Sequence, residues 1–180
     1  MDSTQEAALI QSAQAGDQQA FELLLNKRYD TIYRFALKWC GAVPDAEDIA
    51  QQACIKLAQG IRQFRGDSAF TTWLYRLVIN CAKDWQRSQD KHPPHNDEQP
   101  AQQQASMNPG EHQIYLRQVI LGVAQMGEGF KETLLLVFAE GLNHKEAADV
   151  LGIKESTVSW RIHQMRKHMN LLTAEGGKYE

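Results

Sequence analysis

The sequence predicts an all-α protein made of two small helical domains joined by a flexible linker, with a helix-turn-helix in the second domain. Three observations support this fold class. Apolar residues recur three and four positions apart, which is typical of helices with one buried face, and no strand-like run stands out. A proline- and glutamine-rich stretch near the middle has almost no large apolar residue to bury. Beyond it, helical spacing returns and includes a glycine-marked turn between two helices.

Composition places the domain boundaries. We assign a first domain to residues 1–88, a linker to residues 89–110 and a second domain to residues 111–180. The 180 residues are 43% hydrophobic, which is enough for a modest core in each domain. The first residues lack the basic start and apolar stretch of a signal peptide, and no window approaches the roughly 20 apolar residues of a membrane span. The sequence therefore predicts a cytoplasmic protein with no direct membrane insertion.

Charge and cysteine usage exclude several classes of protein. A net charge of −3 argues against DNA binding through bulk electrostatics, because such binding relies on lysine and arginine displacing counterions from phosphates. Acidic residues gather early and basic residues gather in the last predicted helix, which allows one acidic surface and one basic surface. Cys40, Cys54 and Cys81 have no paired spacing, so we interpret them as small buried hydrophobes. We predict no metal site and no cofactor.

The first helical stretch is expected from about Gln5. Residues 20–39 carry apolar side chains in a roughly 3.6-residue rhythm, which predicts a helix or a helix pair with one buried face. Gly41 and Pro44 then end it.

An acidic segment follows Pro44. Asp45 can cap a new helix that runs to about Gln59, before Gly60. Glu47 and Asp48 would lie in the first turn, where carboxylates interact favourably with the helix dipole. We interpret these acids as a cap and a partner-binding surface.

The most regular helix is expected after the turn at residues 65–68, where Asp67 or Ser68 can act as the N-cap. Its apolar residues predict one continuous buried stripe of Phe70, Trp73, Leu74, Leu77, Val78, Cys81 and Trp85. Another side carries Thr72, Arg76, Asn80, Lys83 and Arg87. That side suits a phosphate backbone and unstacked bases.

In the second domain, helical rhythm returns from Glu111, breaks near residues 127–129 and resumes over residues 130–139. Residues 141–159 then have the layout of a helix-turn-helix. Ala148 is small where two helices must touch, and Gly152 lets the chain leave the first helix in a tight turn. Ile153 and Val158 are expected to fill the wedge between the helices.

The last predicted helix has two faces. Its core side is expected to carry Val158, Ile162, Met165 and Met169. The opposite side, which could enter a major groove, carries Ser159, Trp160, His163, Gln164 and Lys167. Arg161, Arg166 and the helix N-terminus could hold phosphates. An isolated helix of this kind would more often have a merely solvated polar side, but the complete motif favours DNA binding.

These segments occur in the order found in the extracytoplasmic-function class of bacterial sigma factors, and the resemblance covers most of the chain. Residues 45–56, DAEDIAQQACIK, resemble the helix with which sigma factors bind the coiled coil of the polymerase's largest subunit. Residues 64–80, FRGDSAFTTWLYRLVIN, resemble the minus-ten-reading helix of that class and the loop before it. The linker resembles a connector that extends towards the polymerase active-site cleft.

The resemblance implies a sigma factor that directs RNA polymerase core to promoter DNA, initiates transcription and is held inactive by an anti-sigma factor. The implied core-polymerase-binding residues are Asp45, Glu47, Asp48, Gln51, Gln52 and Lys56. The implied minus-ten residues are Arg65, Gly66, Asp67 and Ser68, in a loop that captures a flipped base, with Thr72, Trp73, Arg76, Asn80 and Lys83. The implied minus-thirty-five residues are Ser156, Thr157, Ser159, Trp160, Arg161, His163, Gln164, Arg166 and Lys167.

The chain departs from the class at two places. Gln52 stands where the family often has glutamate, so the polymerase-binding helix is slightly less acidic. Ser159 and Trp160 stand where many relatives have a basic residue followed by serine. The minus-thirty-five sequence therefore cannot be taken from a relative.

The sequence is compared with two other functions, a DNA-binding regulator and a nuclease, and fits each of them less well. A conventional helix-turn-helix regulator would bind its operator without polymerase, usually as a symmetric dimer, and would leave the first domain unexplained. A helical nuclease would use Asp45, Glu47 and Asp48 as metal ligands, but Asp45 and Glu47 cannot share a helix face and no glycine-rich phosphate loop occurs. We expect no catalytic activity.

Overall fold

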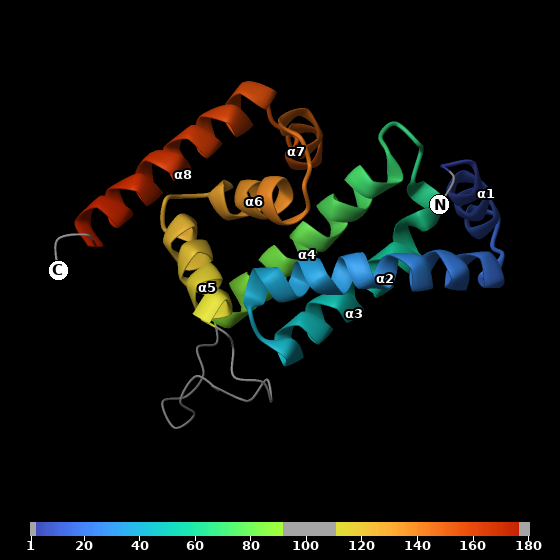
Figure 1. Cartoon of the computed structure of the whole chain (residues 1–180). Helices are drawn as coiled ribbons and strands as arrows, with labels where there is room; N and C mark the ends of the chain where they lie inside the picture. Colours follow the sequence, from blue (N-terminus) through green and yellow to red (C-terminus); the bar gives the residue numbers. More distant parts are fainter. Residues whose placement is uncertain (1–2, 92–110, 177–180) are drawn as a thin grey trace. The chain divides into compact units, whose positions relative to one another are not determined.

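The computed structural model describes residues 3–91 and 111–176, and within those ranges the protein contains helices and no strand (Figure 1). The chain divides into two units, Met1–Gln104 and Ala105–Glu180. The predicted all-α class with two helical units is confirmed. The boundaries at 88 and 110 stay predictions, because helix α4 continues to Lys91 and residues 92–110 lie outside the described part of the chain.

The first unit is built on three long helices and a shorter one. In chain order its elements are α1 (Ser3–Gln14), α2 (Gln18–Cys40), α3 (Val43–Gly60), the 3₁₀ turn η1 (Ile61–Gln63) and α4 (Phe70–Lys91). Helix α2 packs against α1, α3 and α4, and α3 also packs against α4 (Figure 1).

Residues 20–39 belong to one continuous helix, α2, and not to a pair. Asp17 caps its start by accepting a hydrogen bond from the Ala20 N–H, and Gly41 ends it in the left-handed conformation. The large side chains that are fully buried in this unit are Leu24, Ile32, Phe35, Ile49, Leu57, Leu74 and Val78. Each such side chain contributes about 1.5–3 kcal/mol through removal from water.

The buried face of α4 is wider than the predicted stripe and is rotated from it. The predicted positions that are buried are Phe70, Leu74, Val78 and Cys81. Trp73, Leu77 and Trp85 are only half-buried, so the prediction was wrong for these three. Tyr75, Ile79 and Ala82 are buried instead. The reason is that α4 packs against both α2 and α3, so its core side extends beyond a single stripe.

Two predicted helix caps were also wrong. The residue before α3 is Ala42, which makes no side-chain cap bond, and Asp45 lies inside the first turn. Pro44 fits this first turn because its fixed φ suits a helix and its missing N–H would have no partner there. Helix α4 begins after Ala69, whose carbonyl accepts the first helical bond from Trp73, so neither Asp67 nor Ser68 takes the cap position.

The second unit is smaller. Its elements are α5 (Glu111–Ala124), α6 (Phe130–Leu134), the π-helical turn η2 (Leu135–Ala139), α7 (His144–Leu151) and α8 (Glu155–Gly176). Helix α6 contacts α5, α7 and α8, and α7 packs against α8. The fully buried large side chains here are Val123, Leu135, Leu136, Val158 and Met165.

The cysteines only partly follow the expectation. Cys81 is buried, whereas Cys40 and Cys54 are half-buried, and all three are free thiols. Burial raises the pKa of the Cys54 thiol and is also the largest reason why the pKa of Cys81 is raised. Within residues 3–91 and 111–176, no helix is both long and apolar enough to cross a membrane.

Candidate polymerase and nucleic-acid interfaces

Helix α3 presents an acidic and amide-rich face to solvent. Its buried side consists of Ala46, Ile49, Ala50, Ala53 and Leu57. Four of the predicted polymerase-binding residues are exposed, namely Glu47, Asp48, Gln51 and Gln52. Asp45 is half-buried, and partial burial, followed by the negative charge of Asp48, raises the pKa of its carboxyl group. The sequence thus folds into a helix whose polar side is available to a partner.

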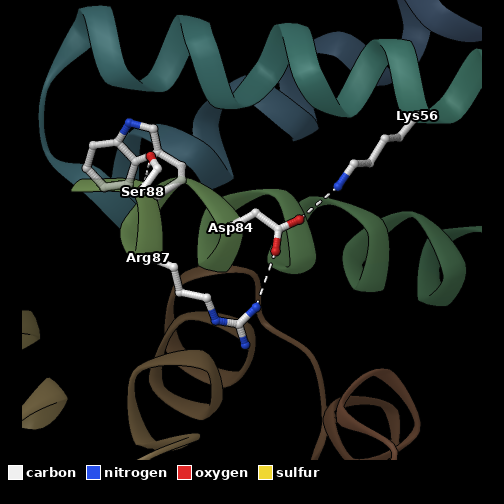
Figure 2. Close-up of polar contacts among 5 residues, drawn as sticks. Lys56, Asp84, Arg87 and Ser88 are labelled. Carbon is white, nitrogen blue, oxygen red and sulfur yellow. Dashed lines mark hydrogen bonds and ion pairs between the residues drawn. The ribbon is translucent and has the colours of Figure 1, made fainter. Parts of the chain in front are cut away.

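Lys56, the sixth predicted polymerase contact, is engaged within the protein. Its Nζ lies 2.9 Å from the Asp84 carboxylate of α4, and Arg87 lies 3.3 Å from the other oxygen of the same carboxylate (Figure 2). The hydrogen bond that Lys56 donates to Asp84 is the largest reason why the pKa of Lys56 is raised. Because the Lys56 and Asp84 side chains are 42% and 55% exposed, this pair connects α3 to α4 without being a buried ion pair.

An open groove of about 490 Å³ runs between α3 and α4. Its walls are formed by Asp48, Ile49, Gln52, Lys56, Cys81, Asp84, Trp85 and Ser88. Ser88 donates a hydrogen bond to the main-chain oxygen of Trp85 at 2.7 Å, one turn from the Lys56–Asp84 pair (Figure 2). The groove brings together three of the predicted polymerase-binding residues, Asp48, Gln52 and Lys56.

The predicted minus-ten loop is exposed between two fixed ends. Arg65, Gly66 and Asp67 are exposed and Ser68 is half-buried. Gly66 has a φ of +78°, in the left-handed region that favours glycine, so the turn depends on this residue.

The aromatic residues on either side of that loop pack together. The Phe64 ring lies 5.5 Å from the Phe70 ring in an edge-to-face arrangement and 5.4 Å from the Trp73 ring. Phe70 and Trp73 are 5.7 Å apart. Trp73 also lies against Gly60, where an added Cβ would come within 3.2 Å of the indole ring. Trp73 is therefore a half-buried member of the cluster that closes the loop.

The polar side of α4 follows the predicted line of residues. Arg76 and Asn80 are exposed, and Thr72 and Lys83 are half-buried. They lie three or four residues apart on α4, so they share one side of the helix that begins after the loop. Such a surface can contact phosphates and unpaired bases.

The helix-turn-helix of the second unit forms as the sequence predicts. Helix α7 ends at Gly152, whose φ is +67° and whose N–H bonds to the Ala148 carbonyl. Ala148 and Val158 are buried where α7 and α8 pack, and Ile153 is half-buried. Val158, Ile162 and Met165 form the core side of α8 as predicted, and Met169 is half-buried.

A capping box at the start of α7 was missed in the sequence. Asn143 accepts a hydrogen bond from the Glu146 N–H at 2.9 Å, and the Glu146 carboxylate accepts one from the Asn143 N–H at 2.8 Å. The spacing of an asparagine three residues before a glutamate could have revealed it. This box fixes the start of the helix that supports the recognition helix.

The outer side of α8 carries the predicted base-reading residues. Ser159, Trp160, His163, Arg166 and Lys167 are exposed, as is Ser156, whereas Gln164 and Thr157 are half-buried. Ser159 is hydrogen-bonded to His144 of α7 at 2.9 Å. Trp160 is 55% exposed, and its ring packs edge-to-face on Phe130 at 5.7 Å, so its orientation is fixed by α6.

Arg161 makes contacts within the protein that the sequence did not predict. Its Nη1 donates hydrogen bonds to the Gly129 carbonyl at 3.1 Å and to the Thr133 hydroxyl at 3.3 Å, and its guanidinium lies over the Phe130 ring at 5.9 Å. The side chain is half-buried and ties α8 to the start of α6. This internal contact differs from the phosphate contact that the sequence led us to expect. No local pattern signals it, because the partners lie about thirty residues away along the chain.

Comparison with known proteins agrees with this arrangement. Residues 24–92 match the Sigma-70 region 2 family and residues 107–169 match the family described as Sigma-70, region 4. The chain is 32% identical over 177 residues to the RNA polymerase sigma-H factor of Pseudomonas aeruginosa, covering 91% of each chain. It is 30% identical over 176 residues to the ECF RNA polymerase sigma-E factor of Escherichia coli K12, covering 90% of this chain and 91% of that factor.

A solved structure has the same fold. It is the sigma factor RpoE in complex with the anti-sigma factor NepR from Bartonella quintana, with a TM-score of 0.65, 19% identity and coverage of 86% of this chain and 96% of that one. These matches span nearly the whole chain. They agree with the order of segments described above, in which a helix resembling the polymerase-binding helix precedes the minus-ten loop and helix, and a helix-turn-helix follows. The chain belongs to the extracytoplasmic-function class of the sigma-70 family of RNA polymerase sigma factors.

Proposed function

We propose that this sigma factor directs RNA polymerase core to promoters by dividing the work among three surfaces. The acidic face of α3 binds core polymerase, the loop and polar side of α4 bind the minus-ten strand, and the outer side of α8 reads the minus-thirty-five element. The observation that carries this assignment is that each polar surface lies on the side of its helix away from the buried core. The family membership does not favour a conventional regulator that works without polymerase.

The proposed polymerase-binding surface consists of Glu47, Asp48, Gln51 and Gln52, with Asp45 and Lys56 at its border. Four exposed polar side chains on one helix, above a stripe of alanines and Ile49 that fixes the helix on α2 and α4, support this role. Carboxylates at this surface would be complementary to basic residues of a partner and would steer its approach.

The proposed minus-ten surface combines the exposed loop with the cationic side of α4. Arg65 and Asp67 can offer hydrogen bonds to the edges of an unpaired base, and Gly66 leaves room for a close approach, since nothing lies within 4 Å of its added Cβ. Arg76 and Lys83 continue along the helix and are suited to the phosphates of the same strand.

The proposed minus-thirty-five surface consists of Ser159, Trp160, His163 and Gln164, with Arg166 and Lys167 beside them. The start of α8 can receive a phosphate at Ser156, which is exposed, because the first N–H groups of a helix have no helical acceptor. The Thr157 N–H already donates to the Lys154 carbonyl at 2.9 Å, so Thr157, which is half-buried, borders this site. We assign Arg161 a supporting role in this surface, because its guanidinium is held by α6.

We also propose an anti-sigma factor as a regulatory partner. The support is the similarity of fold to RpoE, which was solved with the anti-sigma factor NepR. The protein is proposed to act in the cytoplasm, where RNA polymerase works, and to have no catalytic activity or cofactor of its own.

Run-off transcription with purified core polymerase tests the central proposal. Genomic fragments are transcribed with and without the protein, and start sites are mapped to obtain the two promoter elements. Core-dependent initiation at fixed start sites is expected. A gel shift performed with and without core polymerase distinguishes a sigma factor from a conventional regulator, since a regulator would bind its operator without polymerase. Failure to associate with core, together with no initiation from any fragment, overturns the proposal.

A further inference from the structure

Gln14, at the end of α1, contacts the chain segment that leads into the minus-ten loop. Its side-chain Nε2 donates hydrogen bonds to the main-chain oxygens of Ile61, at 3.1 Å, and Phe64, at 2.5 Å. Helix α1 packs against η1 at the end of the first unit where α3 passes into α4 (Figure 1). A residue almost fifty positions earlier in the sequence thus touches both ends of the turn before the loop.

The two carbonyls differ in the main-chain donors available to them, because the Ile61 oxygen has one and the Phe64 oxygen has none among the described hydrogen bonds. The chain leaves helical conformation at Phe64, which has a ψ of 111°. Carbonyls at the end of a helix have no partner in the next turn and need a donor from elsewhere. The Ile61 oxygen already accepts from the Phe64 N–H at 3.2 Å, and Gln14 adds a second donor there and a donor at Phe64.

Helix α1 is itself fixed on the first unit. Arg28 of α2 donates from Nε to the Glu6 carboxylate at 2.7 Å. Ile10 and Ala13 of α1 are buried. Gln14 therefore belongs to a helix that has its own contacts with α2. These contacts hold the Gln14 side chain in position beside the turn.

The loop between Phe64 and Phe70 consequently has two anchored ends and an exposed middle. Phe64 is held through its carbonyl by Gln14 and through its ring by Phe70 and Trp73. Arg65, Gly66 and Asp67, between the anchors, are exposed. The Gln14 hydrogen bonds thus act on the residue from which the chain enters the loop.

We propose that Gln14 is a positioning residue for minus-ten recognition, which holds the entry of the loop at residues 65–68 in the conformation that receives an unpaired base. The inference rests on the function proposed above for that loop. Gln14 makes no contact with DNA in this arrangement and acts through Ile61 and Phe64. Helix α1, which lies outside the matched region 2 segment of residues 24–92, thereby contributes to promoter opening.

The test uses the full-length chain bound to core polymerase. Gln14→Glu keeps the shape of the side chain, removes the donor and places a carboxylate against two carbonyl oxygens. Gln14→Met removes the donor without adding charge. Gln11→Glu and Gln11→Met are matched controls, because Gln11 is exposed on the same helix nearly one turn earlier.

The readout is binding of the holoenzyme to a fork-junction DNA whose minus-ten strand is unpaired, made from a promoter found by start-site mapping. Each position of that strand is replaced in turn by an abasic site, and the position that costs the wild type most identifies the captured base. We expect both Gln14 variants to bind the intact probe about tenfold more weakly than the wild type. On the abasic probe their loss should shrink to about twofold or less, because the misplaced loop no longer has a base to receive.

Several results overturn the inference. Equal losses on the intact and abasic probes would mean general damage, and binding equal to that of the Gln11 variants would mean that the anchor is unimportant. Loss of the whole fold in both Gln14 variants would make Gln14 a stability residue only. If the wild type itself is indifferent to an abasic site at every minus-ten position, the proposed function of the loop fails. A sensitive wild type with unaffected Gln14 variants overturns the positioning role alone.

Discussion

Arg161 of α8 donates a hydrogen bond to the main-chain oxygen of Gly129, with a nitrogen–oxygen distance of 3.1 Å. The same oxygen accepts a hydrogen bond from the buried Thr133 hydroxyl at 2.6 Å. Gly129 has a φ of +84°, and a Cβ placed on it would lie 2.4 Å from the Arg161 guanidinium. The recognition helix is therefore attached to α6 at a point where a side chain on residue 129 would displace the Arg161 guanidinium.

We predict that Gly129→Ala destabilises the second unit by about 2–4 kcal/mol. The left-handed backbone costs a non-glycine residue about 1–2 kcal/mol, and displacement of Arg161 removes its hydrogen bonds as well. Thermal and urea unfolding of the full-length chain labelled with fluorotryptophan provide the measurement, because the fluorine resonance of Trp160 reports on the second unit separately from the other three tryptophans.

Gly141→Ala is the matched control for Gly129→Ala. Gly141 has a φ of +72° and nothing within 4 Å of its added Cβ, so it has the backbone cost without the clash. In an Arg161→Ala background, Gly129→Ala should cost no more than Gly141→Ala does. An undiminished cost in that background would contradict the Arg161–Gly129 contact as the cause.

Local sequence patterns predicted the helices well and their long-range contacts poorly. The helix-turn-helix was predictable because Gly152 and the spacing of Val158, Ile162 and Met165 are properties of one short segment. Arg161 was predicted to contact DNA phosphates, because no residue near it in the sequence indicates that its side chain binds the Gly129 carbonyl. Such a partner is defined only when α6 and α8 pack together.

The errors on α3 and α4 have similar causes. Three- and four-residue spacing predicted one stripe on α4, but two neighbouring helices widen its core to include Tyr75 and Ile79. Asp45 looked like a cap because it follows Pro44, yet the proline fits the first turn and the helix begins earlier. Exposure of the α3 acids did follow from the pattern, since the opposite alanines and Ile49 are a local feature.

We predict that reversing the charge character of the α3 face weakens binding to core polymerase. Asp48→Lys and Gln51→Lys should each reduce affinity at least about tenfold, which is about 1.4 kcal/mol, because a basic partner surface would then meet a like charge. Both residues are exposed, so the melting temperature should change little. Fluorescence anisotropy of the labelled chain against core polymerase measures the affinity.

The control for the α3 face is Gln59→Lys, a like substitution at an exposed position near the other end of the helix. It should leave core affinity close to that of the wild type. Equal weakening by all three variants would indicate a general electrostatic effect, and unchanged affinity for Asp48→Lys and Gln51→Lys would remove this face from the interface.

The Lys56–Asp84 pair should contribute a small, pH-dependent stability. Pairing with Asp84 raises the pKa of Lys56 above its ordinary value of 10.5, so the folded state holds this proton more tightly than the unfolded state. The contribution is fully present below the unfolded pKa and is lost as pH rises through the folded pKa. Because both side chains are well exposed, we expect about 0.2–1 kcal/mol at about pH 8.

The measurement is the difference in unfolding free energy between the wild type and Lys56→Met, which cancels groups that titrate alike in both. That difference should shrink between about pH 10 and pH 12, and also at high salt. Lys91→Met, at the exposed end of α4, should show no such change. A difference that is absent at every pH would mean that Lys56 is available for polymerase and contributes nothing to the contact between α3 and α4.

Trp73 should matter for both stability and promoter opening. Because it is half-buried against Phe64 and Phe70, we expect Trp73→Ala to cost about 1–3 kcal/mol, less than the about 3–5 kcal/mol expected for Phe35→Ala in the fully buried core. At a temperature where both variants are folded, Trp73→Ala should open promoters more slowly, as followed by permanganate reactivity of minus-ten thymines. Opening at the wild-type rate would show that the aromatic cluster does not support the loop.

The choice of minus-thirty-five sequence should depend on Trp160 and Gln164. Trp160 is exposed and held edge-on by Phe130, which suits packing against a thymine methyl group, and Gln164 can pair bidentately with adenine. Losing either contact should cost about 1–3 kcal/mol at one promoter position and relax the preference there.

Lys167 is exposed one turn further on and should contribute phosphate affinity, so Lys167→Ala should weaken all promoters similarly and flatten the salt dependence. Selection of holoenzyme-bound DNA from a library randomised at minus thirty-five separates the two effects. If Trp160→Ala and Gln164→Ala keep the wild-type consensus while Lys167→Ala changes it, the recognition face assigned to α8 is wrong.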